Sequence, residues 1–255
     1  MEIVKNDIYK NVILNQAQTR SNRSPGKKEK KRDVGIVLII LAISIVLLLV
    51  DSLNFLIYPV QLFVVGLHEL SHALMVYITG GEVTGIHIDP MVGGYCSFRI
   101  EDSTIKQILI ASAGYLGSML WGAAIFFLAS VTKLDKVLSF ILGLVMVFLA
   151  FLILKEWSLF GLIFALVFGG FLILSAFFLP LRFNDIMLKF LGLSSCSYVL
   201  VDIFNDLIGR YNIGNDSDII IQLMGLPPVF SVILGIGWMI LAILVMVFTI
   251  KKALA

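Results

Sequence analysis

One stretch decides the fold of this chain: residues 55–78 read FLIYPVQLFVVGLHELSHALMVYI. A helix rises about 1.5 Å per residue, so a mainly apolar run of this length can cross the hydrocarbon core of a bilayer, which is about 30 Å thick. Three ionisable side chains, those of His68, Glu69 and His72, interrupt the run. Because such groups are costly inside a membrane, they usually line a pathway or a site. The stretch therefore predicts a membrane helix that contains a functional site.

The rest of the chain is similarly apolar. Hydrophobic residues make up 59% of the 255 residues and charged residues only 14%, whereas about 25% of the residues in a soluble domain are charged. A backbone in lipid finds no water to bond with, so each membrane-length stretch has to be helical. We therefore predict an all-α polytopic membrane protein with about six to seven transmembrane helices. Besides 55–78, the expected spans are 35–53, 105–131, 137–154, 159–179, 187–208 and 230–250.

The segment between the second and third expected spans is not helical in character. Residues 82–88 alternate in polarity and are rich in β-branched side chains, and residues 95–100 form a second short run of the same kind. Asp89-Pro90 and Gly93-Gly94 lie between the two runs and are turn signals. These features predict a small interfacial β-hairpin.

The polar start of the chain predicts its topology. Residues 15–33 are strongly basic and poor in apolar side chains, so we expect 1–33 to be a disordered, basic cytoplasmic tail and 34–255 to be embedded in the membrane. We expect the basic run to keep the N-terminus in the cytoplasm and to contact the lipid bilayer. We expect no nucleic-acid partner. Seven spans place Lys251 and Lys252 outside the cytoplasm, which the same rule disfavours, so a miscounted span is the alternative. Cys96 and Cys196 are expected to be free thiols.

Residues 68–72 read His-Glu-Leu-Ser-His, which is the HExxH pattern. Histidines four residues apart lie on one face of a helix, so His68 and His72 can both bind one tetrahedral Zn²⁺. Glu69 can accept a proton from a water that attacks a peptide carbonyl, which makes it the candidate catalytic base. The plain alternative is that the three side chains only bond to neighbouring helices. The third histidine, His87, is expected to be an ordinary surface residue.

A catalytic zinc site takes three protein ligands and one open position. The later spans offer two acids, Asp202 and Asp206. If all seven spans alternate from a cytoplasmic N-terminus, the second and the sixth both run toward the cytoplasm. The two histidines then lie about 5–6 Å beyond the middle of their span, and Asp202 lies about 7 Å beyond the middle of its own. We therefore expect Asp202 to be the third metal ligand, with Asp206, about one turn further out, as the alternative.

These patterns resemble the site-2-protease-like intramembrane zinc metalloproteases, and more specifically the compact branch of that family found in bacteria, fungi and plants. The resemblance implies zinc bound by His68 and His72, Glu69 as general base, and cleavage of membrane-embedded substrates. The chain lacks the Asn-Pro…Asp-Gly stretch that holds the third ligand in the best-studied members of the family, and their Ala-Gly-Pro motif is Ala-Gly-Tyr at residues 113–115. The likeness is found at Gly66–Ala73, Gly80–Val83, Ala113–Ser118, Asp202–Ile208 and Ser217-Asp218.

We therefore expect an intramembrane zinc metalloprotease that hydrolyses peptide bonds in or near transmembrane segments of membrane protein substrates. The alternative is a proteolytically inactive membrane protein that binds clients or holds zinc structurally. An exposed edge of the hairpin could present a substrate by pairing with it as an added strand, although a simple surface loop is equally consistent with the sequence. We expect a multi-pass integral membrane protein. In a eukaryote we expect it in the membrane of the endoplasmic reticulum or Golgi.

Overall fold

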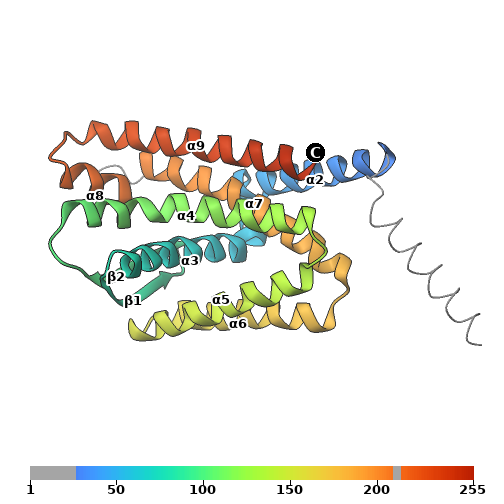
Figure 1. Ribbon diagram of the computed structural model, residues 1–255, viewed down its shortest axis with the longest axis horizontal. Helices are drawn as coiled ribbons and strands as arrows, with labels where there is room; N and C mark the ends of the chain where they lie inside the picture. Colours follow the sequence, from blue (N-terminus) through green and yellow to red (C-terminus); the bar gives the residue numbers. More distant parts are fainter. Residues whose placement is uncertain (1–26, 209–213) are drawn as a thin grey trace, which may run out of the picture.

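The computed structural model describes residues 27–208 and 214–255, and Figure 1 shows their arrangement as a bundle of long helices with a small hairpin at one end. Helix α2 begins at Lys27, so residues 27–33 are helical where we expected disorder, and residues 1–26 lie outside the described part. The elements are α2 (Lys27–Leu49), η1 (Asp51–Leu53), α3 (Asn54–Ile78), β1 (Glu82–Asp89), β2 (Gly93–Arg99), α4 (Thr104–Val131), α5 (Asp135–Lys155), α6 (Leu159–Phe178), α7 (Leu181–Ile208), α8 (Asp216–Leu223) and α9 (Val229–Ala253).

Six helical stretches in the described residues are long and apolar enough to cross a membrane, judged by length and composition. The first expected span instead falls on a shorter apolar helix, Val34–Leu49. The prediction of an all-α polytopic membrane protein with a small β-hairpin is confirmed. The six stretches are Asp51–Ile78, Thr104–Val131, Asp135–Lys155, Leu159–Phe178, Leu181–Leu207 and Val229–Ala253.

The direction of α2 corrects the count of seven alternating spans. Val37 and Ile40, near the start of α2, pack in one apolar cluster against Ile250 and Leu254, at the end of α9. Helix α3 leads into the hairpin at the opposite end of the bundle, so α2 and α3 run in the same direction (Figure 1). The reason is local: the short helix η1 joins α2 to α3, and the chain does not reverse its direction there.

We call the end of the bundle where α2 begins and α9 finishes the terminal end, and the end with β1, β2 and α8 the hairpin end (Figure 1). The α4–α5 and α6–α7 turns lie at the terminal end, and the α5–α6 turn lies at the hairpin end. Helix α3 is in the middle of the bundle, because its apolar side chains form much of the main core. The ionisable groups of residues 68–72 are therefore surrounded by protein, as expected of polar groups at membrane depth.

The β-hairpin is antiparallel, with a register from Glu82↔Arg99 to Asp89↔Gly93. Its turn is fixed by the Asp89 carboxylate, which accepts hydrogen bonds from the backbone N–H groups of Met91 (2.7 Å) and Gly93 (3.3 Å). The Tyr58 hydroxyl of α3 donates to the Pro90 carbonyl at 2.8 Å, so the turn is also attached to the central helix.

The outer edge of β1 is covered by the α5–α6 turn. Lys155 Nζ donates to the Val83 carbonyl at 3.1 Å, and Ser158 Oγ donates to the Ile88 carbonyl at 2.9 Å. Within the residues that the structure describes, the sheet has only these two strands, so the outer edge of β2 pairs with no strand. The fold thus leaves β2, and not β1, as the open edge.

Candidate metal centre

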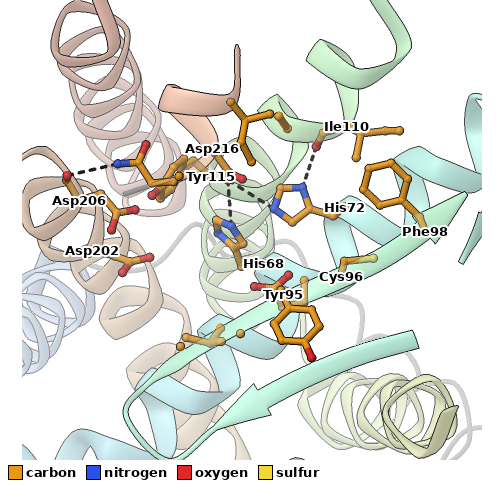
Figure 2. Close-up of a pocket in the computed structure, with 18 of the residues that line it drawn as sticks. His68, His72, Tyr95, Cys96, Phe98, Ile110, Tyr115, Asp202, Asp206 and Asp216 are labelled. Carbon is orange, nitrogen blue, oxygen red and sulfur yellow. Dashed lines mark hydrogen bonds and ion pairs between the residues drawn. The ribbon is translucent and has the colours of Figure 1, made fainter. Parts of the chain in front are cut away.

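His68 and His72 lie one turn apart on α3 and direct both Nε2 atoms at one carboxylate, that of Asp216 (Figure 2). The distances to Asp216 Oδ2 are 3.1 Å from His68 Nε2 and 3.4 Å from His72 Nε2. Ligand atoms at two corners of a tetrahedral zinc site are about 3.3 Å apart when the metal–ligand bonds are 2.0–2.1 Å. The ligand atoms of the three residues all lie within 4.8 Å of one another, so this group can hold a metal ion.

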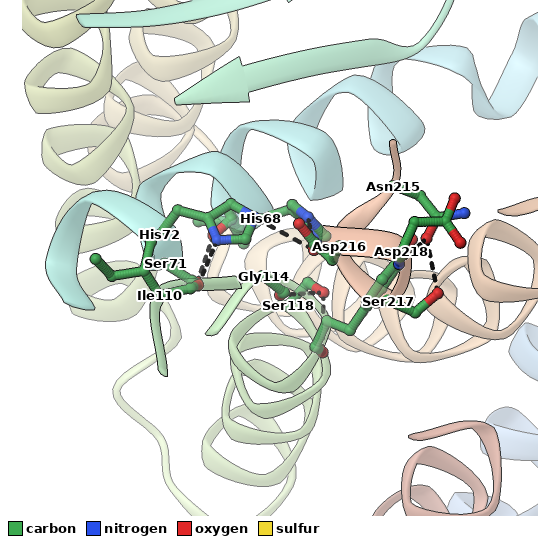
Figure 3. Close-up of polar contacts among 12 residues, drawn as sticks. His68, Ser71, His72, Ile110, Gly114, Ser118, Asn215, Asp216, Ser217 and Asp218 are labelled. Atoms are coloured by element: carbon green, nitrogen blue, oxygen red, sulfur yellow. Dashed lines mark hydrogen bonds and ion pairs between the residues drawn. The ribbon is translucent and has the colours of Figure 1, made fainter. Parts of the chain in front are cut away.

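Asp216 is positioned by the capped start of α8. The Asn215 side chain accepts hydrogen bonds from the Asp218 backbone N–H (3.0 Å) and from Ser217 Oγ (2.7 Å), as Figure 3 shows. The Asn215 amide also donates to the Asp206 carbonyl at 3.3 Å, which attaches the start of α8 to α7. An Asn cap satisfies N–H groups that otherwise have no partner at a helix start. The cap therefore holds Asp216 in the first turn, next to α3.

The Asp216 carboxylate lies against His72 and His68, which lower its pKa when they are protonated. Burial by itself raises the pKa of Asp216, but the neighbouring His72 and His68 outweigh burial and hold the pKa of that carboxyl well below its ordinary value. A carboxylate binds a metal only in the ionised form. The chemistry of this donor set, two imidazoles and one carboxylate, fits a catalytic zinc site.

Each histidine ring is oriented by a contact from α4. His72 Nδ1 donates to the Ile110 carbonyl at 2.7 Å, which leaves Nε2 as the acceptor that faces the metal position. The His68 ring packs edge-on against Tyr115, with centroids 4.9 Å apart and an interplanar angle of 83°. Tyr115 is supported in turn by Trp238 of α9, at 5.1 Å between ring centroids. The Tyr of the Ala-Gly-Tyr sequence therefore packs directly against His68 of the candidate ligand group.

Two glycines of α4 make room for the site. A Cβ atom at Gly114 would overlap the Nε2 atoms of both His68 and His72, and a Cβ at Gly117 would overlap the side chain of Ser71. Glycine at these positions lets α4 lie directly against α3. The missing side chain at Gly114 leaves the space in front of the two Nε2 atoms free for an ion.

A cavity of about 730 Å³ opens beside the ligand group, and Glu69 lines it. Strand β2 forms one wall, and a Cβ at Gly94 would lie 3.1 Å from Glu69 Oε1. Cys96 lines the same wall, and burial raises the pKa of its thiol to about 12. Cysteine binds a metal as the thiolate, and Cys96 is not part of the ligand group found among the described residues. Cys96 and Cys196 are both free, as predicted.

The structure brings His68, Glu69 and His72 to one cavity, and it places Asp216 rather than Asp202 at the histidines. Asp202 and Asp206 also line the cavity, but neither belongs to the ligand group found among the described residues. The reason for this departure is positional. The depth argument considered only acids within spans, whereas Asp216 lies in a short helix between spans that folds back onto α4.

One sequence signal could have indicated Asp216. Gly214 and Asn215 precede two acids, and this order is typical of a capped helix start at the end of a loop. His87, the third histidine, lies in β1, where its ring stacks on Tyr95 at 5.0 Å, and it is not part of the ligand group.

A family model described as Peptidase M50B-like matches residues 36–249 of this chain. The match covers every helix that could cross the membrane except the last residues of α9, and it includes all three residues of the ligand group. No curated protein and no solved structure gives a match.

Proposed function

This chain belongs to the Peptidase M50B-like family, and we propose that it is a zinc endopeptidase that cuts peptide bonds in or near transmembrane segments of other membrane proteins. One observation carries the proposal: the HExxH histidines of a buried membrane helix converge with Asp216 beside a cavity lined by Glu69. Membership in this family supports a metallopeptidase that crosses the membrane several times.

His68, His72 and Asp216 would hold the zinc ion, which supplies Lewis-acid chemistry for the attack of water on a peptide carbonyl. Glu69 takes the proton from the attacking water and passes it to the nitrogen that leaves when the peptide bond breaks. The hydrogen bond from His72 to Ile110 keeps the ligand nitrogen unprotonated during this transfer. Asp216 replaces Asp202 as our proposed third ligand.

The open edge of β2 is suited to present the substrate. A helical segment shields its peptide carbonyls, so it has to be unwound before it can be cut, and pairing with a strand edge holds it extended. The β2 backbone passes the Glu69 carboxylate and lines the cavity, whereas the outer edge of β1 is covered by the α5–α6 turn. A substrate strand added to β2 would therefore place its backbone next to the ligand group.

The rival function is a membrane protein that holds zinc or clients without cutting them. The test is metal analysis of the purified protein together with digestion of a proteome-derived peptide library in detergent, with the products read by mass spectrometry. We expect about one zinc ion per chain and cleavage in the wild type, and neither in the His68→Ala, His72→Ala double variant. Equal zinc in both proteins would contradict the site, and zinc without any cleavage would favour the rival.

A further inference from the structure

We propose that Tyr115 is a further catalytic residue, whose hydroxyl donates a hydrogen bond to the substrate carbonyl oxygen while negative charge develops there. This role rests on the proposed function, because it requires a peptide bond that is cut beside the ligand group. Three observations carry it: how the Tyr115 ring is held, what surrounds its hydroxyl, and which other groups line the cavity.

The Tyr115 ring is held beside the ligand group by two aromatic contacts. It directly follows Gly114, the residue of α4 that faces both histidine Nε2 atoms. Its ring packs edge-on against His68 at 4.9 Å, and Trp238 of α9 supports it at 5.1 Å (Figure 2). Only 4% of Tyr115 is exposed. The ring is therefore fixed before a substrate arrives, which is what a preorganised hydrogen-bond donor requires.

The Tyr115 hydroxyl is a polar group without a partner in the protein. Among the described residues it makes no hydrogen bond, and it is not one of the fully enclosed polar atoms, so it reaches the open space of the cavity that Tyr115 lines. A buried phenol usually finds a partner, because a donor left unpaired costs free energy. The partner of this hydroxyl therefore has to be whatever occupies the cavity, which is water before a substrate binds and the substrate afterwards.

The lining of the cavity is rich in acids, namely Glu69, Asp202, Asp206 and Asp216. Negative charge that develops on a carbonyl oxygen is repelled by nearby carboxylates, so it needs a donor aimed at it. Two other donors of the lining are used elsewhere: the Asn215 amide donates to the Asp206 carbonyl, and the exposed Arg99 lies 3.8 Å from a Glu82 carboxylate oxygen. Tyr115, in contrast, packs on a histidine of the ligand group.

The Tyr115 hydroxyl acts without giving up its proton. When the oxygen of the attacking water bonds to the peptide carbon, one electron pair of the C=O bond moves to the carbonyl oxygen, and Glu69 takes a proton from the water. The Tyr115 hydroxyl donates a hydrogen bond to the oxygen that gains charge. When the C–N bond breaks, that electron pair forms the C=O bond again, and the leaving nitrogen takes the proton from Glu69. Because this hydrogen bond strengthens as the charge grows, it stabilises the transition state more than the bound substrate.

The test is Tyr115→Phe, which removes the hydroxyl and keeps the ring that packs against His68 and Trp238. With a peptide from the cleaved library, we expect about one zinc ion per chain and a KM within about three-fold of the wild type, while kcat falls by at least about ten-fold; loss of one such donor usually costs about 10²- to 10³-fold. Tyr77→Phe is the matched control, because Tyr77 is an exposed residue of α3 that does not line the cavity, and it should keep both constants. An unchanged kcat in Tyr115→Phe would overturn the proposal. Loss of zinc would also overturn it, because Tyr115 would then act only by positioning His68.

A second measurement uses a tetrahedral inhibitor, the same peptide with a phosphinate group in place of the bond that is cut. Such an analogue gains from contacts that are made only in the transition state, so we expect Tyr115→Phe to weaken its inhibition by at least about ten-fold. Equal inhibition of the variant and the wild type would overturn the proposal. Absence of cleavage by the wild type would overturn the proposed function and this role with it, whereas cleavage at the wild-type kcat in Tyr115→Phe would overturn this role alone.

Discussion

Glu69 follows His68 directly, so its side chain leaves α3 about 100° away from the face that the two histidines share. It therefore lines the cavity without joining the ligand group. We expect Glu69→Gln to keep about one zinc per chain and to lower the rate of peptide cleavage by about 10²- to 10⁴-fold, the usual contribution of a general base. Zinc analysis and initial rates measure the two effects. Cleavage at the wild-type rate would remove Glu69 from the mechanism.

The third ligand can be decided by a pair of matched variants. Asp216 Oδ2 is 3.1 Å from His68 Nε2, whereas Asp202 lines the cavity outside the ligand group. Loss of even an outer hydrogen-bond partner of a metal site weakens metal affinity by about 10- to 100-fold, so loss of a ligand should exceed that range. We expect Asp216→Asn to weaken zinc affinity by more than about 100-fold and Asp202→Asn by much less. Competition with a chromophoric chelator measures both, and the reverse order would return the assignment to Asp202.

Gly114 offers a test of the space in front of the histidines. A methyl group there would overlap both Nε2 atoms, so Gly114→Ala should weaken zinc affinity by about 10-fold or more while the helix content stays unchanged. Gly170→Ala is the matched control, because nothing lies within 4 Å of a Cβ at that position. Wild-type affinity in Gly114→Ala would mean that the ion does not occupy this space.

At the scale of elements, the site depends on how three short structures around α3 are attached. The Asn215 cap attaches α8 to α7, the Asp89 turn and Tyr58 attach the hairpin to α3, and the α5–α6 turn closes the edge of β1. Each attachment uses a polar side chain on a backbone group. The apolar packing of the long helices sets the distances, and these bonds fix the orientation of the elements that surround the cavity.

Substrate pairing with β2 predicts an alternating pattern. In a strand, successive N–H groups point to opposite edges, so only every second N–H of a bound substrate bonds to β2. We expect N-methylation of a cleaved peptide at alternate residues near the cut to reduce cleavage about ten-fold or more, while methylation of the residues between them has a much smaller effect. Loss of one hydrogen bond to the strand edge weakens substrate binding by about 1 kcal/mol, and a buried partner left without a hydrogen bond adds to that loss. Equal rates for all the methylated peptides would argue against strand pairing.

At the scale of the whole molecule, the ligand group joins distant parts of the chain. His68 and His72 come from the central helix, and Asp216 comes from α8 at the other end of the sequence. An ion bound by this group would therefore stabilise the assembled bundle against its separated helices. At a free zinc concentration of about 100 times the dissociation constant, this linkage is worth about 2.7 kcal/mol.

We therefore expect removal of zinc by a chelator to lower the unfolding temperature of the wild type in detergent by about 5–10 °C. Addition of zinc should restore the original temperature. The His68→Ala, His72→Ala variant is the control, and its unfolding temperature should not respond to either treatment. A chelator effect of the same size in that variant would mean that the stabilising ion binds elsewhere.

The sequence by itself determined the membrane class, the position of the spans beyond residue 54, the hairpin and the shared face of His68 and His72. All of these depend on local properties: the length of an apolar run, the spacing of residues on one helix, and the turn chemistry of Asp89-Pro90 and Gly93-Gly94. Such properties act within a few residues, so they can be recognised without knowledge of the fold.

Only the tertiary structure decided which acid faces the histidines, which strand edge stays open and which way α2 runs. Each of these depends on contacts between residues far apart in the chain. Asp216 reaches the histidines because α8 is capped and folds onto α4, and because Gly114 allows α4 to approach α3. Distances along one helix do not contain that information, so a depth count favoured Asp202 although packing placed Asp216 at the site.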